Sequence, residues 1–211
     1  MKRRVLTALV LALLLTGGLL SGCSEDNPVA SGATRFATPD ALVDGLKAYY
    51  SGMDYAGYVG ILESDFRFIL QNQDLNECDL ITNYLDRIQE QAVTNRMFNG
   101  AGGLTCDGYA MPPIEGITVN LFLRSTEWTL VTDPESHFVG SSRAQHNFQI
   151  VFNHATAFQS RIEGLVQVHA RDIDPGPEAD WKLTGLEHVS PVKASEDRTW
   201  GVMRLYYRGD S

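Results

Sequence analysis

The sequence predicts an α+β domain in which N-terminal helices pack on one face of an antiparallel sheet. Two observations support this prediction. Helical periodicity is confined to the first half of the chain, before a glycine-rich loop at 100–116, and nearly all later segments are apolar runs typical of strands. Helices that come first and long strands that follow are the pattern of helices segregated to one face of a sheet.

Residues 1–22 have the anatomy of an export signal. Lys2, Arg3 and Arg4 form a charged head, and the apolar run 5–15 follows it. Small and polar residues then interrupt the run before it reaches the roughly 20 apolar residues that span a membrane. We therefore expect this segment to be cleaved.

The segment 20–23, Leu-Ser-Gly-Cys, resembles the bacterial lipobox. The resemblance implies that the Cys23 thiol is acylated and that the bond before it is cut, and several acyl chains make such attachment effectively permanent. Ser24, in place of an aspartate, resembles lipoproteins sorted to the outer membrane more than those kept in the inner one. We expect a lipid-anchored bacterial envelope protein, at the outer membrane and facing the periplasm. An ordinary secretory signal or an uncleaved anchor is the alternative.

The mature chain is strongly acidic. The full sequence has 17 basic and 26 acidic residues, and removing residues 1–22 takes away three positive charges and changes the net charge from −9 to −12. Such a surface repels phosphate backbones and anionic headgroups, so we expect no nucleic-acid partner. The membrane contact should be the lipid on Cys23 alone.

Residues 23–37 are small and polar without a period, which predicts a flexible tether. A single domain is expected over 38–208. Thr38, Pro39 and Asp40 are typical of a helix start, because they supply a cap, a pre-set backbone angle and a favourable charge. Apolar residues at helical spacing then predict the first helix: Leu42, Val43, Leu46, Tyr49 and Tyr50.

Two more helices and a strand are predicted before the glycine-rich loop. Asp54 can cap a short second helix. Residues 65–70 alternate in polarity, which predicts a strand. Residues 79–98 return to helical spacing, with Ile88 on the apolar side, and Gly100 ends that helix.

The second half of the chain predicts a sheet. Leu121 and Leu123 occupy one face of its first strand, whereas Trp128 has the opposite parity, which predicts a bulge near 125–126 that bends the sheet. The predicted strands cover residues 117–131, 137–154, 161–172, 181–189 and 199–207.

Three passages carry a family resemblance. Residues 62–68, Leu-Glu-Ser-Asp-Phe-Arg-Phe, look like the start of the nuclear transport factor two-like superfamily, which includes SnoaL-like proteins and ketosteroid isomerase. Residues 180–187 and 199–207 resemble its last two strands, as found in exported bacterial lipoproteins. The resemblance covers 38–208 and implies a cone, or cystatin-like roll, in which N-terminal helices pack on a strongly curved antiparallel sheet that wraps a long helix and leaves a pocket at the open end.

The resemblance does not extend to isomerase chemistry. It places Leu70 at the position of the family's aspartate base and Leu46 at that of its tyrosine donor, and neither leucine can do that chemistry. Tyr50 and Tyr58 lie nearby, but without the carboxylate we interpret them as residues at the edge of the core whose hydroxyls reach water or the backbone.

The histidines and the acidic loop do not predict a metal site. His146 and His154 share a face of one strand, yet eight residues separate them by roughly 26 Å. His169 has the parity of a solvated face. The acidic loop 172–180 lacks the ligand positions of a helix-bounded calcium loop, and its prolines and glycine predict a solvated hairpin loop. No metal and no cofactor is expected.

Cys78 and Cys106 form an even pair once Cys23 is assigned to lipid. In an oxidising compartment such a pair predicts a disulfide, with two unpaired buried thiols as the alternative. Its role would be structural, because no Cys-x-x-Cys spacing is present.

Two functional hypotheses follow. The favoured one is a non-catalytic lipoprotein that binds a small apolar ligand or a protein partner through its cone pocket or sheet face. The alternative is an isomerase, dehydratase or hydrolase of the same fold, with acid and base groups at other positions, such as His154 with Arg124 or Glu187. Contiguous exposed apolar residues on the sheet would point to a homodimer. The residues expected to line the pocket are Trp128, Phe148, Phe152, His154 and Trp181.

Overall fold

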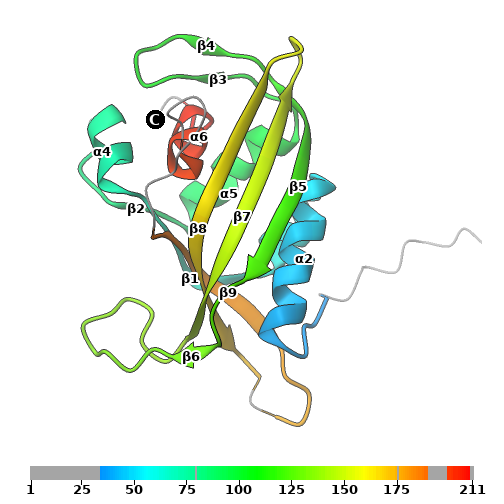
Figure 1. The fold of residues 1–211 in the computed structure, drawn as a ribbon, viewed down its shortest axis with the longest axis vertical. Helices are drawn as coiled ribbons and strands as arrows, with labels where there is room; N and C mark the ends of the chain where they lie inside the picture. Colours follow the sequence, from blue (N-terminus) through cyan, green and yellow to red (C-terminus); the bar gives the residue numbers. More distant parts are fainter. Residues whose placement is uncertain (1–33, 79, 175, 190–198, 210–211) are drawn as a thin grey trace, which may run out of the picture. The chain divides into compact units, whose positions relative to one another are not determined.

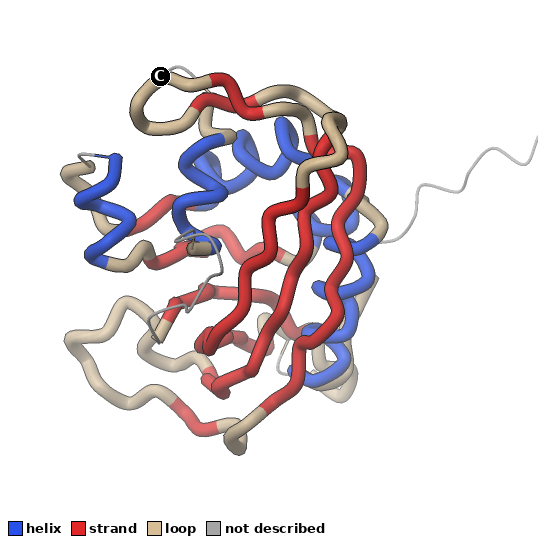
Figure 2. Tube along the Cα trace, turned by 45° about the horizontal axis from the view of Figure 1, so that its top comes forward, coloured by secondary structure: helices blue, strands red, loops and turns tan. Residues whose placement is uncertain are grey.

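The computed structural model describes residues 34–78, 80–174, 176–189 and 199–209. At their centre is one curved sheet of seven strands, in the order β2, β1, β9, β8, β7, β5, with β6 paired to β7. Helices pack on this sheet, as predicted, and Figures 1 and 2 show it wrapping around α5 and α6. The predicted leader and the lipobox lie outside the described residues.

The two N-terminal helices begin at the predicted caps. The Thr38 hydroxyl accepts a hydrogen bond from the Ala41 amide at 3.1 Å, at the start of α2 (Pro39–Ser51). The Asp54 carboxylate accepts one from the Gly57 amide at 2.9 Å, at the start of α3 (Tyr55–Gly60). Both contacts satisfy amide groups that have no partner inside the helix.

The segment between β1 (Leu62–Ile69) and residue 100 differs from the prediction. A helix over 79–98 was expected, but the chain forms α4 (Asn72–Cys78), the short strand β2 (Tyr84–Asp86) and α5 (Arg87–Phe98). The reason is local: Asp86 and Gln89 form a capping box that starts α5 eight residues later than predicted. As a result Ile88 is 76% exposed instead of packed in the core.

The sheet is antiparallel except where β1 pairs with β9 in parallel. Its long strands agree with four of the five predicted segments. The remaining strands of this sheet are β5 (Ile114–Arg124), β6 (Thr129–Leu130), β7 (Ser142–His154), β8 (Gln159–Asp172) and β9 (Trp181–His188). A separate two-stranded hairpin is formed by β3 (Gly103–Leu104) and β4 (Ala110–Met111).

The pairing register of β5 with β7 shifts between Val119 and Leu121, earlier than predicted. It shifts again close to the predicted position, because Arg124 pairs with His146 whereas Thr129 pairs with Arg143. The earlier shift turns Phe122 into the core and leaves Leu123 59% exposed. A shift by one residue exchanges the two faces of a strand.

The fifth predicted strand, 199–207, is a helix. The chain forms α6 (Trp200–Tyr206), and the Thr199 hydroxyl accepts a hydrogen bond from the Val202 amide at 2.9 Å to cap it. All seven residues of α6 are buried. The described C-terminal part of the chain therefore packs inside the curve of the sheet instead of extending it.

The core begins before the predicted start of order. Phe36, inside the predicted tether, is 8% exposed, and its ring meets that of Tyr49 edge-on at a centroid distance of 6.5 Å. Its carbonyl oxygen accepts a hydrogen bond from the Trp181 amide at 3.0 Å.

Among the described residues, no helix is long and apolar enough to cross a membrane.

Candidate functional site

The interior of the cone, where a pocket was expected, is occupied by α6. The Trp200 ring lies against the rings of Phe148 and Phe68, with centroid distances of 5.1 and 5.6 Å, and against Tyr50 at 5.8 Å. Trp200 is 1% exposed. The space left beside it, next to Phe122, has no room for a water molecule. No open pocket therefore remains at this position.

An ion pair lies deep in the same interior. The Nε atom of Arg204 on α6 donates to both carboxylate oxygens of Glu90 on α5, at 2.9 and 3.1 Å. The Tyr58 hydroxyl donates to Glu90 at 2.6 Å, and that of Thr94 donates at 3.2 Å. All four side chains are buried. The interior thus contains a connected polar cluster, which the sequence did not predict.

Aromatic rings surround the remaining part of the Arg204 guanidinium. Its central carbon lies 4.2 Å from the Phe68 ring centroid, 4.5 Å from that of Trp200 and 5.6 Å from that of Tyr50. Both Nη atoms lack a hydrogen-bond partner among the described residues. Cation–π attraction replaces these hydrogen bonds in part, because the ring faces carry negative charge.

Burial and the neighbouring charges shift the pKa values of this cluster. Burial raises the pKa of Tyr58 well above its ordinary value, and the negative charge of Glu90 raises it further. Burial alone lowers the pKa of Arg204, but Glu90 and the two tyrosines outweigh that effect and raise it above its ordinary value. Tyr58 is therefore a neutral hydrogen-bond donor and Arg204 a permanent cation.

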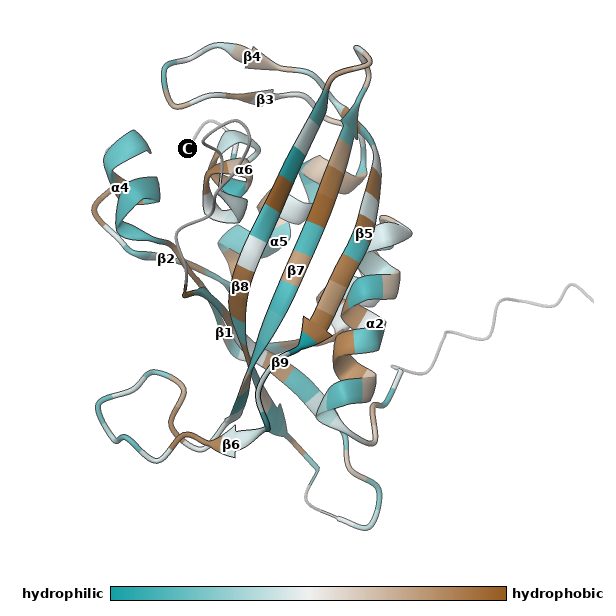
Figure 3. Cartoon of the chain, in the orientation of Figure 1, coloured by the Kyte–Doolittle hydropathy of each residue, from teal (hydrophilic) through white to brown (hydrophobic). Residues whose placement is uncertain are grey.

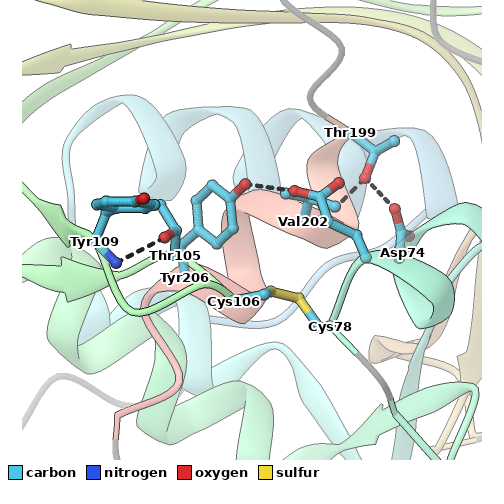
Figure 4. The surroundings of a disulfide bond; sticks show 9 residues. Asp74, Cys78, Thr105, Cys106, Tyr109, Thr199, Val202 and Tyr206 are labelled. Atoms are coloured by element: carbon cyan, nitrogen blue, oxygen red, sulfur yellow. Dashed lines mark hydrogen bonds between the residues drawn. A yellow bond between two sulfur atoms is a disulfide. The ribbon is translucent and has the colours of Figure 1, made fainter.

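Hydrogen bonds also hold α6 on the side that faces α4. The Asp74 carboxylate accepts a hydrogen bond from the Thr199 hydroxyl and one from the Gln71 amide at 2.8 Å. The Tyr206 hydroxyl donates to Glu77 at 2.5 Å. Figure 4 shows Asp74, Thr199 and Tyr206 around the disulfide. Burial raises the pKa of Asp74 despite its two hydrogen bonds.

Cys78 and Cys106 are joined in a disulfide, in agreement with the prediction. Their Cα atoms are 4.9 Å apart, and 28 positions separate them in the sequence. The bond connects the end of α4 to the β3–β4 hairpin (Figure 4). These are two segments that contact α6 from different sides.

The residues predicted to line the pocket do not share a cavity. Phe148 and Phe152 are 1% and 0% exposed and belong to the core. The Trp128 indole packs near His146 and donates to Asp40 at 3.0 Å. Trp181 is paired with Asp172 at the far end of the sheet. In the described part of the chain, α6 packs against Phe148 in the interior that these residues were expected to line.

His154 lies near neither of its proposed partners. Its Nε2 atom is 3.1 Å from the Ser160 hydroxyl, and its Nδ1 atom is 3.3 Å from the Tyr207 hydroxyl. Arg124 pairs with the opposite end of β7, across from His146. Glu187 instead lies 3.5 Å from His169. The predicted acid–base pairs with His154 are therefore wrong.

His169 is buried, not solvated as its strand parity suggested. The Phe138 ring stacks on it at a centroid distance of 3.8 Å, because the loop between β6 and β7 folds over this part of the sheet. Gly185 on the neighbouring strand makes the stacking possible, since a Cβ atom there would collide with Phe138. Desolvation lowers the pKa of His169.

His146 and His188 are also buried, at 1% and 8% exposure. Desolvation lowers the pKa of His146 to about 4. Desolvation, followed by the nearby positive charge of Arg204, lowers the pKa of His188 to about 4. Both rings are neutral at pH 7.

The two leucines at the isomerase positions are core residues. Leu46 is 2% exposed and Leu70 is 4% exposed. Tyr50 and Tyr58, interpreted as residues at the edge of the core, are instead buried inside it, and the Tyr58 hydroxyl donates to a carboxylate and not to water.

The loop 172–180 lies between β8 and β9 as predicted, and Asp172 accepts hydrogen bonds from the amides of Asp174 and Asp180.

Sequence reasoning missed Glu90, Arg204 and Asp74. A weak signal existed for Glu90, because it shares a helical stripe with Val93 and Met97, and a carboxylate within an apolar stripe suggests a buried partner. Arg204 was assigned to a strand, so its burial inside the cone was not predicted. Asp74 lies in a helix that the sequence did not predict.

No protein-family model matches the chain. No curated protein matches it either. Among solved structures, it resembles a conserved protein from Planctomyces limnophilus, with 8% identity, a TM-score of 0.49, and coverage of 74% of this chain and 93% of that one. It also resembles a hexachlorocyclohexane dehydrochlorinase, with 8% identity, a TM-score of 0.43 and coverage of 75% and 87%.

A further match is an NTF2-like protein of unknown function from Exiguobacterium, with 10% identity, a TM-score of 0.40, and coverage of 70% of this chain and 96% of that one. At such identities the likeness concerns the fold alone and transfers no activity. The described part of the chain itself has helices packed on a curved sheet that is antiparallel except for the pairing of β1 with β9.

Proposed function

We propose that this chain is a lipid-anchored, extracytoplasmic binding protein that performs no catalysis of its own. The observation that supports this proposal is the occupation of the cone by α6. Trp200 is 1% exposed and Arg204 is completely buried, so the space for a small apolar ligand or a substrate is already filled. The cone then serves as a scaffold, and recognition takes place on its outer surface.

The outward face of β7 and β8 is the surface that fits a protein partner. Figures 1 and 3 show α5 and α6 behind these strands. Two shallow hollows of about 270 Å³ each lie on this face, one lined by Gln145 and Gln167 and the other by Asn147 and Glu163. Amide side chains can both donate and accept hydrogen bonds, which suits a polar interface.

This polar character favours a transient partner over a permanent homodimer. Interfaces of obligate dimers are more apolar than the rest of a protein surface, whereas those of transient complexes are about as polar as that surface. On β7 the outward positions from 143 to 149 are Arg143, Gln145, Asn147 and Gln149. We therefore assign this face to a second protein at the outer membrane, facing the periplasm, where the lipid on Cys23 would hold the chain.

Two measurements test this function. Mass spectrometry of the protein isolated from native membranes should find an acylated Cys23 as the N-terminal residue. A photoreactive phenylalanine analogue at Asn147 or Gln167 should give the same protein adduct in intact cells, whereas one at the exposed Ala48 on α2 should not. Recovery of full-length, unacylated chain, or equal adducts at all three positions, would contradict the proposal.

A second candidate function is an isomerase, dehydratase or hydrolase. The contact that favours it is the 2.6 Å hydrogen bond between Tyr58 and Glu90, which pairs a donor with a carboxylate inside the cone. A substrate could reach this pair only if α6 withdrew. The variant Y58F separates the two candidates. If the chain is a binding protein, Y58F should keep both its partner adducts and its cellular role. If the chain is such an enzyme, Y58F should lose the cellular role while the partner adducts still form.

A further inference from the structure

A hollow of about 520 Å³ lies outside the cone, between the end of α5, the β3–β4 hairpin and the last turn of α6. Its volume falls within the range of small-molecule sites, which is about 300–1,000 Å³. It is separate from the outward sheet face assigned to a protein partner. Arg96, Thr105 and Arg208 are among its lining residues.

The walls of this hollow are fixed by several contacts. The Arg96 Nη2 atom donates to the Gly102 carbonyl oxygen at 3.0 Å. Gly103 lies so close to α6 that a Cβ atom on it would collide with the Tyr206 carbonyl oxygen. Cys106 is held by its disulfide to Cys78. A ligand would therefore meet a cavity that is already formed, which reduces the entropic cost of binding.

The charge of the lining is opposite to that of the chain. Arg96 and Arg208 line the hollow, and no Asp or Glu is among its described lining residues. Neither arginine forms an ion pair with a carboxylate in the described part of the chain. The Arg96 Nε atom is buried without a hydrogen-bond partner among those residues. Guanidinium groups without a carboxylate partner can bind an anion, and their planar set of donors matches the geometry of carboxylate and phosphate oxygens.

The lining also offers apolar surface beside the two charges. Leu104 on β3 is 45% exposed and lines the hollow together with Leu205 of α6. An anion with a short apolar body would place its head between the arginines and its body on Leu104.

We propose that this hollow is a binding site for a small amphiphilic oxyanion, with a carboxylate or phosphate head and a short apolar body. The site does not depend on the protein-binding function proposed above, because it uses neither the sheet face nor the cone interior. Its ligand is held by Arg96 and Arg208, with Leu104 in contact with the apolar part.

Ligand-observed fluorine NMR on the full chain tests the site. The probes are 4-(4-fluorophenyl)butyrate, 4-fluorophenyl phosphate and the neutral 4-(4-fluorophenyl)butyramide. One or both anions should show saturable line broadening at millimolar concentration, and the amide should show none. The anion that binds more tightly identifies the head group. Absence of saturable broadening with both anions, or equal broadening with the amide, would overturn the proposal.

The variants R96Q and R208Q localise the binding. Each removes one charge-assisted hydrogen bond and should weaken anion binding by about tenfold. The control R35Q makes the same charge change at an exposed arginine outside both proposed sites and should leave binding unchanged. Arg208 is exposed, so R208Q tests the site even if R96Q destabilises the fold. Equal weakening by R35Q would show a general charge effect and would overturn the assignment.

Discussion

The Nε atom of Arg204 lies 2.9 and 3.1 Å from the two carboxylate oxygens of Glu90, and neither side chain has any exposed surface. This contact joins α6 to α5 in the middle of the cone. A buried ion pair is not by itself a large source of stability, because both charges must leave water. Removing only one partner, however, leaves a buried charge without compensation, and α6 then loses its attachment.

The first prediction concerns this ion pair. The variant R204M should lower the free energy of unfolding by about 3–5 kcal/mol, because the Glu90 carboxylate stays buried without its partner. The double variant E90L/R204M should recover much of the loss. Urea denaturation measures both. The surface pair of Arg161 and Glu163 supplies the control, since R161M should cost less than about 1 kcal/mol. Equal losses in R204M and R161M would contradict the buried pair.

Trp200 provides a second test. W200A should destabilise the protein by roughly 3–5 kcal/mol, because it removes a large buried ring and leaves a cavity. L130A, at a residue that is 62% exposed, should change stability by less than about 0.5 kcal/mol. Thermal and urea unfolding of the two variants measure the difference. A W200A protein as stable as L130A would show that the ring is not part of the core.

The disulfide gives a third prediction. Opening the bond between Cys78 and Cys106 should lower stability by roughly 3–4 kcal/mol, the chain-entropy value for a loop of this length. The measurement is urea unfolding with and without a reducing agent. The double variant C78S/C106S should be destabilised to a similar degree and should not respond to the reductant. If the reducing agent leaves the stability of the wild-type protein unchanged, the two thiols are not joined.

Acid should destabilise the fold through its buried histidines. The pKa of His146 and of His188 is about 4 in the folded protein, against about 6.5 in an unfolded chain. Because the unfolded state binds more protons between these values, stability is complete above pH 6.5 and falls as the pH drops towards 4. Each group contributes a slope of about 1.4 kcal/mol per pH unit within that window.

The variant H188F isolates this contribution, since a ring of similar size keeps the contact with Phe148. Urea unfolding at several pH values between 4 and 7 should show a shallower pH dependence in H188F than in the wild type. Other titrating groups, including Asp74 with its raised pKa, contribute equally to both proteins. Parallel pH profiles would contradict a neutral, buried His188.

The first two helices and the four long strands could be predicted from the sequence because their signals are local. Thr38 and Asp54 cap their helices through contacts three residues away. Phe148 and Phe152 alternate with polar neighbours along β7, as expected for a strand with one buried face. Caps and periodicity depend on neighbours in the chain, and the sequence shows both.

The remaining parts depend on long-range contacts. A helix that is buried on all sides has no polar face, so α6 shows no helical period and resembles a strand. Its one local signal was the cap at Thr199, which was overlooked. His169 became buried because Phe138, 31 positions earlier in the sequence, stacks on it. Strand parity cannot reveal a covering loop.

The central claim is that α6 closes the cone, and the accessibility of Trp200 tests it most directly. In the variant W128F/W181F, Trp200 is the only tryptophan of the chain. Acrylamide should quench its fluorescence with a constant several-fold smaller in the folded protein than in urea, because the ring is 1% exposed. Equal quenching in the folded and unfolded protein would show that α6 lies outside the cone and that the interior is open.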